Sequence, residues 1–362
     1  YEIMHSLVGS EMCIRDRDGT LRAVSATDAT TLSASQSPFP ADTTPDVVAI
    51  GPSVSRVYTA STSAGTLTVY DSAANPTTFD VGGHPDGMAL SSDGRSLYLT
   101  DSEAATLTVV DTETMLVVRT LDLGVRPVDP VLSSDGKTLY VTDNLADRLL
   151  MVDTESGAIT SVGVGRSPTS PVISPDGTTA YTLTARDGDG WVWVTDLENG
   201  SGDHIPVGGA PSAQALSADG KYLYVAVRDR ILIIDTTSPD VVGSVSVSDA
   251  PQEMVVDPQT GSLVYTDAVN QRIGFINRGQ VTGDVVARDA ESDTLSYAVA
   301  AAPEHGTVVI DRATGKWIYI SDAAGLIQDD SFTITVTDGV GAATTATVVI
   351  EGTIVEPAPV AV

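Results

Sequence analysis

Cysteine, histidine and basic residues are scarce in this sequence of 362 residues. The one cysteine, Cys13, excludes an internal disulfide framework and a thiolate zinc cluster. Four histidines are too few and too scattered for the haem or copper sites of some redox proteins. Lysine and arginine number 19 against 48 aspartate and glutamate residues, a formal net charge of −29. Because nucleic-acid affinity depends on cations that displace counterions, we expect no nucleic-acid partner.

Long apolar runs and catalytic signatures are also missing. No apolar stretch approaches the roughly 20 residues of a membrane-spanning helix, so we expect no membrane insertion in this fragment. The sequence contains no nucleophile elbow, phosphate-binding loop, zinc motif or dinucleotide fingerprint. These absences argue against an enzyme without excluding one.

The first 17 residues differ in character from the rest of the chain. Codons allowed for Leu7 to Asp16, within the stretch SLVGSEMCIRDR, include a reading that resembles a transposase adapter used in sequencing-library preparation. We therefore interpret residues 1–17 as an adapter-derived, non-native segment and leave them out of the fold prediction. The alternative is a genuine flexible N-terminus. On the first interpretation the native start lies upstream, and a signal peptide would not be visible in this fragment.

An internal repeat organises the middle of the chain. Six segments follow one template and begin at prolines 40 to 43 residues apart: Pro45, Pro85, Pro127, Pro168, Pro211 and Pro251. Each unit contains short runs rich in Val, Ile, Leu, Tyr and Thr, and in four units an Asp-Gly pair marks a hairpin turn after the first run. Four strands in about 41 residues are typical of a propeller blade. We therefore predict an all-β fold, with a β-propeller over residues 18–279.

The runs LYVTD, LYLTD, VVDT and MVDT resemble the YVTN family of bacterial and archaeal β-propeller repeats over residues 45–278. The resemblance implies the fold and says little about activity. A tyrosine recurs in the second run of each unit, and we expect it to pack between blades: Tyr58, Tyr98, Tyr140, Tyr181, Tyr224 and Tyr265. An aspartate ends the third run in four units, and we expect it to accept backbone N–H groups: Asp111, Asp153, Asp196 and Asp235.

The number of blades is left at six or seven. Six repeat units are visible, but the sixth lacks a fourth run. Residues 20–35 resemble the last half of a unit. We expect this segment to complete the ring by pairing with the last unit.

A different pattern begins at Val281. The combination of GTVVIDRATGKWIYISDAA with DDSFTITVTDG is similar to the cadherin-like and VCBS-type Ig-like repeats of large bacterial adhesins and exoproteins. We predict an Ig-like β-sandwich over residues 280–352, with Trp317 and Phe332 in its core, and a proline-bearing linker over residues 353–362. Further Ig-like modules are expected in the intact chain.

Acidic residues of this module form a candidate Ca²⁺ site. Asp289, Glu291 and Asp293 occupy alternate positions, and Asp338 follows in a later turn. Oxygen ligands at this spacing could surround one Ca²⁺. The resembling families carry a fuller acidic motif here, so a solvated acidic turn is the alternative. No other cofactor is indicated.

Candidate binding residues of the propeller lie near the first run of each unit, which would line the central channel. His84 and Arg126 occupy the same position, directly before the repeat proline, and could bind an anion together. Asp86, Asp129 and Glu253 follow repeat prolines and could converge on a divalent cation. The alternative is that all five are ordinary polar residues at the rim of the channel.

These observations predict a non-enzymatic scaffold or adhesion-type protein, secreted or at the cell surface, whose propeller face binds a protein or a glycan. One alternative is a propeller enzyme of the lactonase or lyase class with a divalent metal in the channel. Another is a propeller that binds a small ligand.

Overall fold

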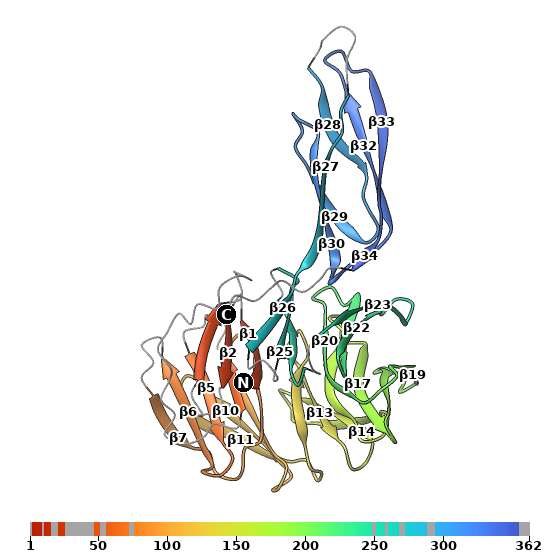
Figure 1. Ribbon diagram of the computed structural model, residues 1–362. Helices are drawn as coiled ribbons and strands as arrows, with labels where there is room; N and C mark the ends of the chain where they lie inside the picture. The colour runs from red at the N-terminus through yellow and green to blue at the C-terminus, as the bar shows by residue number, and fades with distance from the viewer. Residues whose placement is uncertain are drawn as a thin grey trace.

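The fold is entirely β-structure in the described part of the chain (Figure 1). The described residues form strands, turns and irregular segments but no helix, so they contain no helix that is long and apolar enough to cross a membrane. The prediction of an all-β protein is therefore confirmed. The computed structural model describes residues 2–8, 11–15, 21–25, 47–50, 56–71, 76–247, 251–257, 260–267, 272–287 and 294–354.

The six repeat units form successive antiparallel sheets, which are the blades of a propeller. The first strands of neighbouring blades contact one another, so they surround the centre of the ring. The first blade contains β4 (Val47–Ile50), β5 (Arg56–Ser61), β6 (Thr66–Asp71) and β7 (Pro76–Asp80). The second contains β8 (Gly87–Leu90), β9 (Ser96–Asp101), β10 (Thr106–Asp111) and β11 (Leu116–Asp122). The third contains β12 (Val128–Leu132), β13 (Thr138–Asp143), β14 (Arg148–Asp153) and β15 (Ile159–Gly163).

The remaining repeat units continue the ring. The fourth blade contains β16 (Thr169–Ile173), β17 (Thr179–Arg186), β18 (Asp189–Asp196) and β19 (Gly202–Pro206). The fifth contains β20 (Pro211–Leu216), β21 (Tyr222–Val227), β22 (Arg230–Asp235) and β23 (Asp240–Ser246). The sixth has three strands in the described residues: β24 (Met254–Val256), β25 (Leu263–Asp267) and β26 (Arg272–Ile276).

The N-terminal strands occupy a seventh position in the ring. β1 (Glu2–Val8), β2 (Glu11–Arg15) and β3 (Leu21–Ser25) form their own sheet, and β1 contacts both β4 and β24. Within residues 21–25, β3 pairs with β2 and not with the last repeat unit, so the expected pairing is wrong for this part of the segment. A short connection makes this local pairing entropically cheaper than pairing with a strand about 250 residues away. The rest of segment 26–35 lies outside the described residues.

The repeated turn between the first two strands of a blade follows from the motif Ser-x-Asp-Gly. In the second blade, the hydroxyl of Ser91 donates to Oδ1 of Asp93 at 2.7 Å, and the backbone N–H of Arg95 donates to the same oxygen at 3.0 Å. The N–H of Gly94 donates to the carbonyl of Ser91 at 2.8 Å. Corresponding bonds form around Asp135, Asp176 and Asp219. The predicted Asp-Gly hairpins are therefore present.

The other recurring residues also have the expected roles. The six repeat tyrosines are all buried, with exposed fractions of 6 % or less. The aspartates that end the third strands accept backbone N–H groups of the following turn, as Asp111 does from Thr114 at 2.7 Å. These contacts lower the pKa of the Asp111 carboxyl below its ordinary value, with the Thr114 N–H as the main cause.

The C-terminal module is a small sandwich of two three-stranded sheets (Figure 1). Trp317 and Phe332 meet edge to face in its core, with ring centroids 5.2 Å apart. One sheet pairs β27 (Arg278–Asp284), β30 (Lys316–Ala324) and β29 (Gly306–Ile310). The other pairs β28 (Ser296–Ala301), β32 (Asp330–Thr337) and β33 (Ala343–Ile350), and the short strands β31 (Leu326–Ile327) and β34 (Thr353–Ile354) pair with each other.

Candidate functional site

A pocket of about 440 Å³ lies where loops of the first three blades meet. The β5–β6 turn, the segment leading into β8, the β9–β10 turn and the segment leading into β12 all contribute to it. The pocket brings together three of the five predicted rim residues. Its lining residues are Thr62, His84, Asp86, Ser102, Glu103 and Arg126.

Asp101, at the end of β9, holds the loops of this pocket in place. One carboxylate oxygen accepts the backbone N–H of His84 at 2.7 Å. The other accepts the N–H groups of Glu103 at 3.0 Å and Ala104 at 2.7 Å. Asp101 is only 6 % exposed, so this buried carboxylate fixes both the segment leading into β8 and the β9–β10 turn. The hydroxyl of Thr62 adds a bond from the first blade to the carbonyl of Pro85 at 2.8 Å.

The role of Asp101 was missed in the sequence analysis, although a signal was available. Asp101 and Asp143 are the last residues of the runs LYLTD and LYVTD, and Asp143 is also buried, at 2 % exposed. Asp143 accepts the N–H groups of Leu145 and Ala146, as Asp101 does in its own turn. Recurrence of a buried carboxylate in the motif indicates a loop-positioning residue.

The charged groups of the pocket differ in their environments. The Asp86 carboxylate accepts the N–H of Ser102 at 3.1 and 3.3 Å, and burial raises its pKa above the ordinary value despite this bond. His84 Nδ1 lies 3.5 Å from an oxygen of Glu103, and both side chains are more than half exposed. Arg126 is exposed and makes no hydrogen bond or ion pair with the described residues.

These six side chains offer groups that can bind a ligand. The Arg126 guanidinium is available for a carboxylate or another planar anion. Asp86 and Glu103 offer acceptor oxygens for hydroxyl or amino groups of a ligand.

Asp129 and Glu253 lie elsewhere in the ring. Oδ2 of Asp129 accepts the N–H of Ser170 at 2.9 Å, a bond between the third and fourth blades. Glu253 precedes β24 in the sixth blade, where its backbone N–H and carbonyl meet Thr266. Across the described ranges no three His, Cys, Asp or Glu side chains are grouped to hold a metal ion. The structure therefore does not assemble Asp86, Asp129 and Glu253 into a cation site.

The proposed Ca²⁺ ligands are only partly described. Asp289, Glu291 and Asp293 lie outside the described residues. Asp338 follows β32, and its Oδ1 accepts the N–H groups of Val340 at 3.0 Å and Ala342 at 2.7 Å. This oxygen therefore stabilises the turn between β32 and β33.

Comparison with known proteins identifies both parts of the architecture. The model of the bacterial cadherin-like domain family matches residues 248–354, which include the sixth blade as well as the sandwich. In fold, the chain is similar to Kuenenia stuttgartiensis hydrazine synthase (TM-score 0.64, 19 % identity, covering 75 % of this chain and 94 % of that chain). It is also similar to the β-propeller domain of Cps50 (Swd1) from Myceliophteria thermophila (TM-score 0.60, 14 % identity, covering 74 % of this chain and 92 % of that domain).

The structural likenesses show the fold alone at these identities. No curated protein matches the sequence. The comparisons therefore indicate a β-propeller joined to a cadherin-like domain.

Proposed function

We propose that this protein is a non-enzymatic scaffold, secreted or at the cell surface, whose propeller binds a carboxylate-bearing protein or glycan. The observation that carries the proposal is the pocket formed by loops of three blades, whose loop backbones Asp101 holds. The pocket also contains Arg126, which has no partner among the described residues. Loops held this way need little ordering when a ligand binds, which favours affinity. The cadherin-like match supports an extracellular setting, because such domains are typical of extracellular proteins.

Arg126 supports one anionic group on the ligand at this position, although the chain as a whole is acidic and Asp86 and Glu103 also line the pocket. Arg126 forms no ion pair with the described residues, so its guanidinium can form a bidentate pair with a ligand carboxylate. His84 beside it can donate a further hydrogen bond, and the acceptors Asp86 and Glu103 suit the hydroxyl groups of an acidic sugar.

The test is a calorimetric titration with two defined probes, an oligogalacturonate and a glutamate-rich peptide. We expect Arg126→Ala to weaken binding of the recognised probe about 10- to 100-fold, the value of a lost charge-assisted hydrogen-bond pair. Arg95→Ala is the matched control, because Arg95 is exposed at the opposite end of the second blade and its loss changes the net charge equally. Equal affinity in both variants, or no binding of either probe by the unmodified chain, contradicts the proposal.

A small-ligand-binding propeller is the second candidate. The pocket volume of about 440 Å³ is within the usual range for small-molecule sites, roughly 300–1,000 Å³. Titration with galacturonic acid distinguishes the two. A monosaccharide that binds as tightly as the oligomer favours the small-ligand function, and a large gain with length favours an extended partner.

A further inference from the structure

A turn of the C-terminal module is buried against the propeller. Residues 321–328, which we name the clasp, include the end of β30 and the turn into β31. Ala323, Ala324 and Leu326 are 0 %, 1 % and 6 % exposed. They belong to one apolar cluster with residues of the fifth and sixth blades: Tyr222, Tyr224, Ile231, Ile233, Val245, Met254, Leu263, Tyr265 and Ile276.

Backbone contacts fix the clasp against both blades. The N–H of Ala324 donates to the hydroxyl of Tyr224 at 2.8 Å, and the N–H of Gly325 donates to the carbonyl of Asn277 at 3.1 Å. A β-carbon on Gly325 would lie 2.6 Å from Val245 and 2.9 Å from Ile276. The turn is therefore wedged between β23 and β26 with no room for a side chain at this position.

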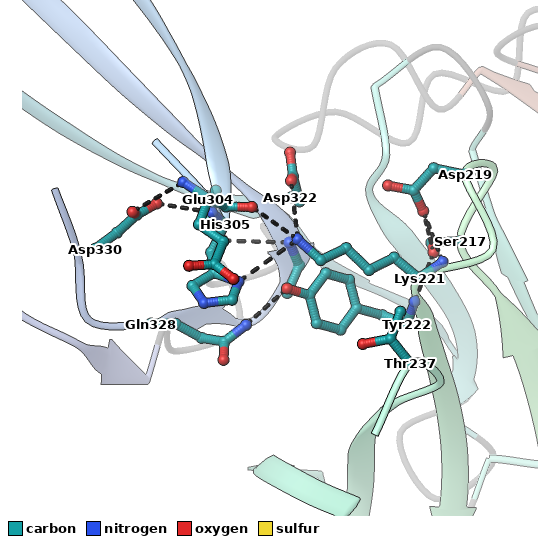
Figure 2. Close-up of polar contacts among 12 residues, drawn as sticks. Ser217, Asp219, Lys221, Tyr222, Thr237, Glu304, His305, Asp322, Gln328 and Asp330 are labelled. Carbon is teal, nitrogen blue, oxygen red and sulfur yellow. Dashed lines mark hydrogen bonds and ion pairs between the residues drawn. The ribbon is translucent and has the colours of Figure 1, made fainter. Parts of the chain in front are cut away.

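Polar contacts also join the module to Lys221 and Tyr222 of the fifth blade (Figure 2). Nζ of Lys221 donates to the carbonyl of Glu304 at 2.9 Å and lies 3.6 Å from a carboxylate oxygen of Asp322. Within the module, Nη2 of Arg278 lies 3.2 Å from the other carboxylate oxygen of Asp322. The amide of Gln328 donates to the hydroxyl of Tyr222 at 2.6 Å. These charged groups are about one-quarter exposed or less, so water screens them only partly.

The clasp lies where the sixth blade is incomplete. In the described residues β26 is the outermost strand of that blade, whereas the other repeat blades have a fourth strand. Outer-strand residues of other blades pack against the next blade, as Leu121 and Ile205 do. We propose that the clasp covers the apolar surface between β23 and β26, so that blades five and six depend on the module for their stability. The partner of the apolar surface of blades five and six is therefore the cadherin-like module of the same chain.

The attachment also determines which way the pocket faces. Lys221 belongs to the turn between the first two strands of its blade, whereas Ser102 and Glu103 of the pocket belong to a turn between the second and third strands. Successive turns of an antiparallel sheet lie at opposite ends of its strands. The module therefore holds the propeller at the end opposite the pocket and leaves the binding face open. The clasp would act in this way whether or not the pocket binds a carboxylate.

Hydrogen exchange of the full chain, followed by mass spectrometry, tests the dependence. We expect Leu326→Asp to speed exchange at least about tenfold in peptides of β21–β26, because a charge replaces a buried side chain. In thermal unfolding, the midpoint of these two blades should fall by about 10 °C. Exchange in β32 and β33 should stay slow. Ile318→Asp is the matched control, because Ile318 is in the same module but is 43 % exposed.

A second variant leaves the module sequence intact. Tyr224→Phe removes the acceptor of the Ala324 N–H and leaves that group buried and unpaired, so the same blade peptides should exchange about tenfold faster. Unchanged exchange in blades five and six in both variants overturns the proposal. If Leu326→Asp unfolds the module itself, Tyr224→Phe alone decides the outcome.

Discussion

Two glycines in equivalent turns provide the sharpest test of how blade packing modifies a repeated motif. Gly177 and Gly220 are the glycines of the Ser-x-Asp-Gly turns in blades four and five, with φ angles of +74° and +78°. A β-carbon on Gly177 would meet nothing within 4 Å. A β-carbon on Gly220 would lie 2.8 Å from Cδ of Pro175, which belongs to the turn of the preceding blade.

The expected magnitudes follow from these surroundings. Alanine in the left-handed region costs about 1–2 kcal/mol in the folded state, partly offset by about 0.4–1 kcal/mol because the unfolded chain also becomes less flexible. Gly177→Ala should therefore cost about 1 kcal/mol. Gly220→Ala adds a steric overlap with a rigid ring, worth about 1–3 kcal/mol, and should cost about 2–4 kcal/mol in total.

Thermal unfolding of the full chain measures the difference. About 1 kcal/mol lowers the midpoint of a domain of this size by about 2–4 °C, so the second variant should melt clearly below the first. Pro175→Ser removes the ring and should bring the Gly220→Ala variant close to Gly177→Ala, a coupling that a double-mutant cycle resolves. Equal midpoints for the two alanine variants, or no rescue by Pro175→Ser, would refute the reasoning.

Two further predictions concern acid stability and the module core. Hydrogen bonds from the Ser156 and Ser174 side chains are the main cause that lowers the pKa of Asp153 and Asp176. Their folded pKa values lie below the unfolded value of about 3.9, so the stability they contribute is present above pH 4 and is lost as the pH falls through the folded values. An unfolding midpoint that stays constant between pH 4 and pH 2 would contradict this. In the module, Trp317 buries an indole N–H without a partner in the described residues, so Trp317→Phe should destabilise by much less than the about 3–5 kcal/mol expected of Phe332→Ala in chemical denaturation. Comparable losses would show that the indole N–H is satisfied.

In the proposed scaffold, the contact with the module sets the direction of the propeller's binding face relative to the module. The clasp joins the module to two blades through a buried apolar contact and the ion pair between Lys221 and Asp322. A ligand in the pocket would then be held at a set direction relative to the module. This geometry suits a protein that presents a binding face at a distance from its attachment.

Local chemistry made much of the fold predictable. Serine, aspartate and glycine in the order Ser-x-Asp-Gly specify a turn through bonds that span only a few residues, and the tyrosine of each second strand is buried by the blade beside it. The change of pattern near Val281 likewise predicted a second unit, and β27 begins at Arg278. The candidate site was only partly predictable. His84, Asp86 and Arg126 share the pocket, but Asp129 and Glu253 have nearly the same positions in their own repeats and lie elsewhere.

The sequence by itself thus determined the strand pattern, the repeat and the acidic character of this protein, because these depend on side-chain type and on neighbours a few residues away. Tertiary structure alone decided which loops form one pocket, that Asp101 holds them, and that a turn of the module packs between β23 and β26. The contact between Ala324 and Tyr224 joins residues 100 positions apart. No local pattern specifies such a contact, because it exists only once the ring has placed its blades and the module has reached them.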